Sequence, residues 1–193
     1  MAAIILIFVL FSASRPDPED SLNHARFAYL QHDQVNFDKY VDVQSVLGDW
    51  ADQAGNEWVQ EQKPGLPARL IMQGGIQAAK GAYLPDLSQW VDHFVISGTL
   101  TQQPQSNANN STDNFLAGFF SSGLRTLVSS QLSYEGVASK SISGASALLN
   151  VNLHTPLRTQ PVVVKIAMQK VGDHWRVVGV QDLAGLLQQL GQS

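Results

Sequence analysis

The sequence predicts an α+β fold in which N-terminal helices pack on one face of a four-stranded antiparallel sheet and a short C-terminal helix follows. Two observations predict this architecture. In the N-terminal part of the chain, apolar side chains recur at three- and four-residue steps, which is the spacing of one helix face. From Gln131 onward the period changes to two, the spacing of one face of a strand. The predicted helices come first and the strands second, and the 193 residues contain no internal repeat. This order predicts one domain.

The first helix is expected at residues 22–32, with Ser21 as its N-cap. One stripe of this helix is formed by Leu22, Ala25, Arg26 and Tyr29. Asp33 then caps a short turn, and Asp42 precedes the longest helix, whose apolar residues recur at helical steps as far as Trp58. This helix is expected to end before residues 63–65, where proline and glycine follow.

Further helices complete the helical half. Residues 66–83 predict a weaker helix, and Pro85 fits the first turn of a separate one with a clean apolar stripe. Residues 101–114 are polar and of low complexity, so they bury too little apolar surface to become ordered, and we expect a mobile loop. Asp113 is the expected cap of one more helix, whose inward residues are Phe115, Leu116, Phe119, Phe120 and Leu124.

The C-terminal half predicts four strands that form an antiparallel meander. Their apolar residues alternate over 132–137, 145–153, 162–168 and 175–180. Loops at 155–160 and 172–173 carry the turn residues that close hairpins. Leu183, Leu186, Leu187 and Leu190 then recur at helical spacing and predict the short C-terminal helix.

Composition excludes several classes of function. The chain has 12 Lys and Arg against 16 Asp and Glu, a net charge of −4, and only 15% charged residues. Such a chain lacks the basic surface that binds nucleic acid or anionic lipid, so we expect no nucleic-acid partner. The absence of cysteine excludes disulfides, thiolate nucleophiles and cysteine zinc sites.

The first eleven residues form an unbroken apolar run, followed by the small residues Ser12, Ala13 and Ser14. The run has the length of a signal-peptide core and is shorter than the roughly 20 residues that span a bilayer. No positive charge precedes it, so a longer uncleaved anchor is an alternative, and a core strand or helix is another. We expect a signal peptide or anchor at 1–14, a tether at 15–20 and a single domain at 21–193. This organisation predicts export to, or anchoring in, a bacterial cell envelope, with membrane contact only through the N-terminal segment.

No standard catalytic or metal-binding pattern is present. His24 and His32 lie about 12 Å apart along one helix at 1.5 Å per residue, too far for one metal ion. Asp92 and His93 are neighbours and point about 100° apart on a helix, so they form no dyad. The chain has neither a G-x-S-x-G elbow nor a phosphate-binding glycine loop. We therefore assign no catalytic residue, no metal site and no cofactor.

The remaining candidate is a mixture of aromatic and polar side chains around the longest helix. Helices on curved sheets often enclose apolar pockets, which are the usual ligand sites. The candidate pocket or motif residues are Phe37, Tyr40, Asp42, Trp50 and His93. In the alternative interpretation the aromatic residues fill the core and Asp42 caps a helix.

The stretch Phe37-Asp-Lys-Tyr40-Val41-Asp42, after the helix ending in His32-Asp33, resembles the F-x-x-Y-V-D motif of a family of exported bacterial proteins of unknown function. The stretch from Gly172 to Val178 is similar to the last strand of that family. The resemblance implies an exported or membrane-anchored protein and transfers no catalytic residue. The order of helices and strands is also similar to the nuclear-transport-factor-like and cystatin-like architectures, which host both enzymes and binding modules.

Three hypotheses follow. The first is a non-enzymatic envelope protein that binds an unknown protein or a small apolar ligand. The second is a small pocket enzyme of the nuclear-transport-factor-like kind, with Asp42, Tyr40 or His93 as acid–base groups. The third is a structural module that spaces other envelope components.

Overall fold

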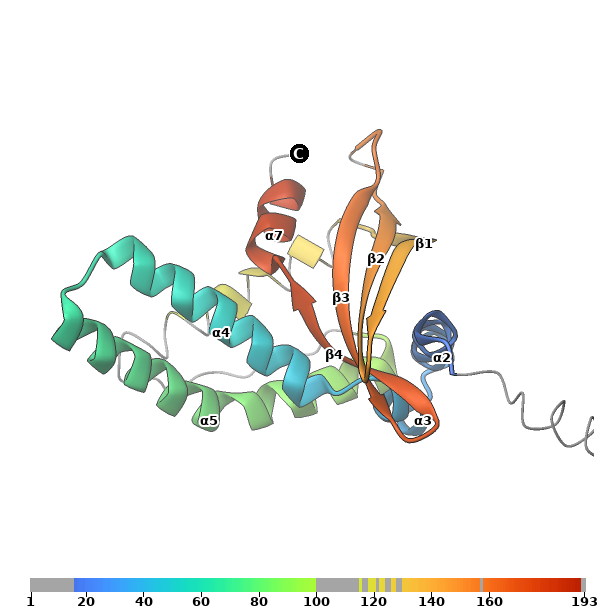
Figure 1. Cartoon of the computed structure of the whole chain (residues 1–193), viewed down its shortest axis with the longest axis horizontal. Coiled ribbons are helices and arrows are strands. Elements are labelled where there is room, and N and C mark those ends of the chain that lie inside the picture. Colours follow the sequence, from blue (N-terminus) through green and yellow to red (C-terminus); the bar gives the residue numbers. More distant parts are fainter. Residues whose placement is uncertain are drawn as a thin grey trace, which may run out of the picture.

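The computed structural model describes residues 16–99, 115, 118–120, 122–123, 126–127, 130–156 and 158–191. The α+β fold is confirmed: helices pack against a four-stranded antiparallel sheet and a short helix follows it (Figure 1). The helices before the sheet are α2 (Pro18–Leu30), α3 (Gln34–Tyr40), α4 (Val43–Gln62) and α5 (Leu66–Ser97). The later elements are β1 (Ser133–Ser143), β2 (Ser146–His154), β3 (Val162–Val171), β4 (His174–Gln181) and α7 (Leu183–Gly191).

The sheet is the predicted meander, with spatial order β1-β2-β3-β4. A two-residue turn joins β3 to β4, and Gly172 in this turn has φ of +59°, a left-handed conformation that glycine adopts without strain. In β2 the alternate residues Ala147, Leu149 and Val151 are buried, as the period of two predicts. The buried face of the sheet is therefore readable from the sequence.

Within the described residues, the helices that contact the sheet lie on this one face. Val164 and Met168 are four residues apart in β3, so their side chains point to the same side. Val164 belongs to the part of the core that contains Trp50 of α4, whereas Met168 belongs to the part that contacts Leu22 of α2. The opposite face of the sheet mixes polar residues such as Ser141, Asn150 and Gln169 with apolar ones such as Leu148 and Val163.

Helix α4 is held on β4 by a close approach and a side-chain clamp. A Cβ atom at Gly179 of β4 would lie 2.7 Å from the Asp49 carboxylate of α4, so only glycine allows this approach. The Gln53 amide donates to the Val180 carbonyl at 2.7 Å, and its oxygen accepts a hydrogen bond from the Leu183 N–H at 3.1 Å. One glutamine thereby joins α4, β4 and the start of α7.

The two helices predicted around Pro85 are one helix. Helix α5 runs without interruption from Leu66 to Ser97, beside α4 and away from the sheet (Figure 1). A proline inside a helix costs about 3 kcal/mol because it removes a hydrogen bond to the residue four positions earlier. Here that residue is Gly81, which is exposed, so water can reach its carbonyl group. Burial of large side chains on both sides of the proline, each worth roughly 1.5–3 kcal/mol, offsets the cost; they are Ile76, Leu87 and Trp90.

The first helix starts earlier than the sequence predicted. Helix α2 begins at Pro18, and its N-cap is Asp17, whose side chain accepts a hydrogen bond from the Glu19 N–H at 2.9 Å. Residues 18–20 of the predicted tether are therefore the first helical turn. Ser21 is not the cap: it is buried, and its hydroxyl accepts a hydrogen bond from the Trp175 N–H at 3.0 Å. Apolar spacing alone does not mark these polar first residues, but an N-cap aspartate followed by proline and acidic residues is a sequence signal of a helix start.

Several predicted segments lie wholly or partly outside the described residues. These are the signal peptide or anchor at 1–14, the mobile loop at 101–114 and much of the helix after Asp113. Of that last helix, Phe120 is described and buried against Trp50 of α4, with ring centroids 5.8 Å apart. Among the described helices, none combines the length and apolar character needed to cross a membrane.

Candidate functional site

Asp42 and Trp50 serve the fold rather than a pocket. The Asp42 carboxylate caps α4 by accepting a hydrogen bond from the Ser45 N–H at 3.0 Å, which confirms the capping interpretation. Its second oxygen lies 3.6 Å from the Arg176 guanidinium. Trp50 is 6% exposed, and its ring meets Phe119 and Phe120 in the core.

Tyr40 and His93 lie in different places. The Tyr40 ring stacks on His24 at 5.2 Å between centroids and meets the His174 ring edge-on at 5.5 Å. The His174 ring nitrogens lie 2.9 Å from the Asp173 carboxylate and 3.0 Å from the Lys39 carbonyl oxygen. His93 is exposed on α5 and lies 3.3 Å from the Ser97 hydroxyl. The rings of His24, Tyr40 and His174, without His93, hold α2, α3 and β4 together at one corner.

Phe37, the fifth predicted residue, lines a groove between α2, α3 and the sheet. The groove has a volume of about 320 Å³. We call it the apolar groove and define it by Leu22, Ala25, Arg26, Tyr29, Phe37, Val41, Tyr134, Val151, Leu153, Ile166 and Val177. Of these eleven side chains, only Arg26, Tyr29 and Tyr134 carry a polar atom, so its wall is almost wholly apolar.

Local sequence explains each wall of the groove. On α2 the stripe predicted from helical spacing, Leu22 to Tyr29, faces the sheet. On the opposite wall Tyr134 of β1 and Leu153 of β2 are paired across the strands. The floor is closed by Val41, which bridges to Val177, while the Asp42 N–H donates to the Val177 carbonyl at 2.9 Å. The short linker between α3 and α4 is thereby fixed on β4 at the floor of the groove.

Arg26 and Tyr134 form the polar part of this wall. The guanidinium carbon of Arg26 lies 5.1 Å from the Tyr134 ring centroid, within the range of a cation–π contact. Burial raises the pKa of the Tyr134 hydroxyl, as does the negative charge of Glu19, while the positive charge of Arg26 acts against them. The guanidinium carbon also lies 5.9 Å from the ring centroid of the exposed Phe27, so the arginine head is held at the rim of the groove by two aromatic rings.

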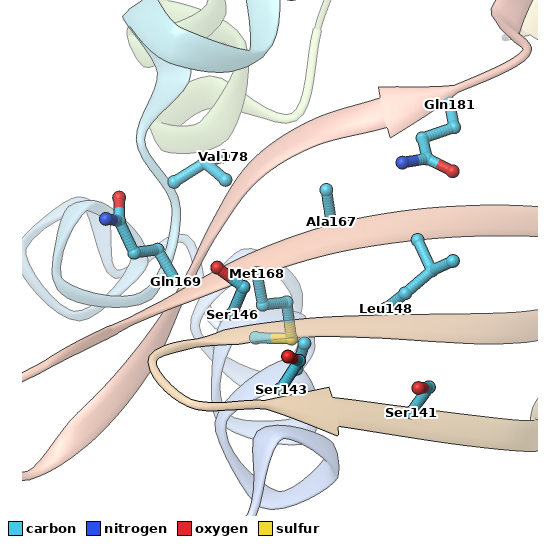
Figure 2. A pocket seen from close by; sticks show the side chains of 10 residues that line it. Ser141, Ser143, Ser146, Leu148, Ala167, Met168, Gln169, Val178 and Gln181 are labelled. Carbon is cyan, nitrogen blue, oxygen red and sulfur yellow. The ribbon is translucent and has the colours of Figure 1, made fainter.

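Other hollows offer different chemistry. Figure 2 shows one on the open face of the sheet, with a volume of about 420 Å³ and side chains of Ser141, Ser143, Gln169 and Gln181 around it. None of its ten lining residues is ionisable. A second hollow, between α4 and α5, contains Asp52, which pairs with Lys80 at 2.7 Å. Neither hollow has the apolar lining of the groove.

Comparisons of the chain with protein-family models, with curated proteins and with solved structures find no match. The resemblance to an exported bacterial family therefore stays a prediction, as do the two architectures with a similar order of elements. Within the described part of the chain, no group of three or more His, Asp or Glu side chains is placed to hold a metal ion.

Sequence reasoning missed most of the groove. It placed Arg26 and Tyr29 on one stripe of the first helix but did not assign them to a site. Tyr134, Leu153 and Ile166 are far from α2 in the sequence, and no local spacing connects them to it. The one available signal was Arg26 itself. A charged residue is rare on a helix stripe that faces the core, so its presence there indicates a special environment.

Proposed function

We propose that the protein is a binding module of a bacterial cell envelope, exported or membrane-anchored, whose apolar groove takes a small apolar ligand. The observation that carries this proposal is the groove itself, with a volume of about 320 Å³ and three polar side chains among eleven. Ligand sites are typically clefts of about 300–1,000 Å³ with apolar walls and a few polar groups. The groove fits this description at the small end of the range.

Binding explains the groove better than acid–base catalysis does. A pocket enzyme of the nuclear-transport-factor-like kind needs titratable groups aimed at its substrate. Asp42, Tyr40 and His93 do not line the groove: the first caps a helix, the second lies between two histidine rings, and the third is exposed on α5. Among the described residues, the only ionisable side chains in its lining are one arginine and two tyrosines.

The envelope part of the proposal is supported by the sequence alone. It rests on the apolar run of residues 1–11, the polar residues that follow, and the resemblance of Phe37 to Asp42 to the F-x-x-Y-V-D motif of exported proteins. Cell fractionation of the full-length chain tests it. Recovery of the protein in the membrane or periplasmic fraction is expected, and recovery only in the cytosol would contradict this part.

A binding titration tests the ligand part. We expect a simple apolar molecule such as octanol to bind the wild-type protein, and Leu22→Trp to abolish binding because the larger ring enters the groove. Ala82→Trp adds the same side chain at an exposed position on α5 and should leave affinity unchanged. If both variants bind as the wild type does, or if the wild type does not bind, the groove is not a ligand site and a structural role becomes the better hypothesis.

A further inference from the structure

We propose that the ligand of the apolar groove is a medium-chain carboxylic acid, with its chain in the groove and its carboxylate on the Arg26 guanidinium. This inference rests on the binding function proposed above and names the class of ligand. It is argued from the charge at the groove, the partners of the neighbouring cations, and the size of the space.

Among the described residues that line the groove, Arg26 is the only cation; its stem contributes to the wall, and its guanidinium lies at the rim, because the lining itself exposes no polar surface. The residue is exposed, but its guanidinium lies over the Tyr134 ring, which is itself part of the opposite wall. Next to it on α2, Ala25 is 4% exposed and faces the interior. Arg26 therefore sits at the edge of the groove, with the apolar wall on one side and water on the other.

Among the described residues, no carboxylate lies within 4.0 Å of Arg26, whereas nearby cations have acidic partners. Lys140 binds Asp17 and lies 3.7 Å from Glu19. Arg176 lies 3.6 Å from Asp42 and donates to the Asp38 carbonyl oxygen at 2.9 Å. Glu19, the acidic residue whose charge acts on Tyr134, is thus already beside a lysine. The guanidinium of Arg26 keeps its planar set of donors free for an external anion.

A carboxylate fits these donors better than other head groups. The guanidinium fork binds a carboxylate through two parallel hydrogen bonds. A phosphate monoester carries nearly two negative charges at neutral pH, and the groove supplies only one cation. An ammonium head would meet the positive charge of Arg26. One positive charge at the edge of an apolar wall therefore selects an apolar molecule with a single negative charge.

The volume sets an upper bound on the buried part of the ligand. At about 30 Å³ for each water-sized group, the groove of about 320 Å³ holds roughly ten non-hydrogen atoms. The carbon chain of octanoate, with about eight atoms, fits within this volume and leaves its carboxylate at the rim. Each buried methylene should strengthen binding roughly fourfold, so a chain of this length makes a measurable contribution.

The test compares octanoate, octanol and octylamine as ligands in calorimetric titrations of the full chain. We expect the wild type to bind octanoate roughly ten- to hundredfold more tightly than octanol, which is the range for hydrogen bonds to charged groups. Arg26→Gln should reduce octanoate to the affinity of octanol, and Arg26→Glu should favour octylamine. Arg69→Gln, an exposed arginine on α5, is the matched control and should keep the preference.

The possible results separate the two proposals. Equal affinity of the wild type for octanoate and octanol, or a preference that survives Arg26→Gln, would overturn the carboxylate assignment and leave apolar binding standing. Absence of binding by all three ligands would overturn both. Thermal melts of each variant must show the wild-type transition, which is expected because the Arg26 head is at the surface and makes no ion pair among the described residues.

Discussion

The indole N–H of Trp175 donates a hydrogen bond to the backbone oxygen of Pro16 at 2.6 Å. This bond joins the last strand to the residues before the first helix, 159 positions apart in the chain. Ser21 strengthens the same junction, because its hydroxyl accepts the backbone N–H of Trp175. The start of α2, which carries one wall of the apolar groove, is thereby fixed on β4.

Replacement of Trp175 should strongly destabilise the protein. The side chain is 3% exposed, so Trp175→Ala should cost roughly 3–5 kcal/mol in free energy of unfolding, measured by urea melts. Trp175→Phe keeps most of the ring and loses the hydrogen bond to Pro16, and should therefore cost less. A melt of the alanine variant that matches the wild type would contradict the position of the indole in the core.

Truncation at the N-terminus should distinguish the domain from the segment before it. A chain that starts at Arg15 keeps Pro16 and the Asp17 cap, and should be soluble and melt cooperatively. A chain that starts at Ser21 loses the cap, worth about 1 kcal/mol, and the bond from Trp175, worth a similar amount. It should therefore melt at lower denaturant concentration. If both chains melted alike, residues 16–20 would contribute nothing to the fold.

Asp42 should behave as a helix cap. Asn caps as well as Asp does, so Asp42→Asn should be nearly neutral, whereas Asp42→Ala should cost about 1 kcal/mol. The ion pair with Arg176 at 3.6 Å is partly exposed and should add little. Chemical denaturation of the two variants measures the difference. Equal and severe loss in both would mean that the negative charge itself is required.

Asp38 and Asp92 should contribute more to the stability of the protein in mild acid than at neutral pH. In mild acid the two carboxyl groups are protonated, whereas at neutral pH they carry a charge that burial disfavours. Burial raises the pKa of both carboxyls, and the negative charge of Asp38 further raises that of Asp92. A carboxyl whose folded pKa lies above its unfolded value of about 3.9 binds its proton more tightly when folded. Its contribution to stability therefore grows as the pH falls through the folded pKa, and is complete below the unfolded pKa.

Asp92→Asn removes this penalty and should raise the free energy of unfolding at pH 7. It should also flatten the pH dependence of stability in the range above pH 4. Asp86→Asn, at an exposed position on the same helix, is the control and should change neither. Urea melts at several pH values measure both quantities. A destabilised Asp92→Asn variant would show that the carboxylate has a stabilising partner.

The order and periods of the elements could be predicted because apolar spacing reports burial directly. The alternation of Ala147, Leu149 and Val151 fixed a strand and its buried face. The break at Pro85 was wrong because local propensity can be overridden by packing, here by Leu87 and Trp90. The start of α2 was missed because apolar spacing does not mark its polar first turn, although Asp17 as N-cap, Pro18 and Glu19 are local signals of a helix start.

The site was less predictable than the fold. Phe37 lines the groove, but Trp50 does not, since a regular aromatic spacing shows that a residue is buried and not whether a space lies beside it. Arg26 was placed on the correct stripe of α2, yet its position at the groove depends on its contact with the Tyr134 ring of β1. Contacts between segments this far apart in the sequence have no signal in local spacing.

The most direct test of the account is to locate a bound apolar ligand by NMR. Octanol titrated into uniformly labelled protein should shift the backbone amide signals of groove residues such as Ala25, Val151 and Ile166. Signals of Ser141 and Gln169, on the open face of the sheet, should stay in place. Shifts confined to the open face, or no saturable shifts at all, would contradict a ligand site in the apolar groove.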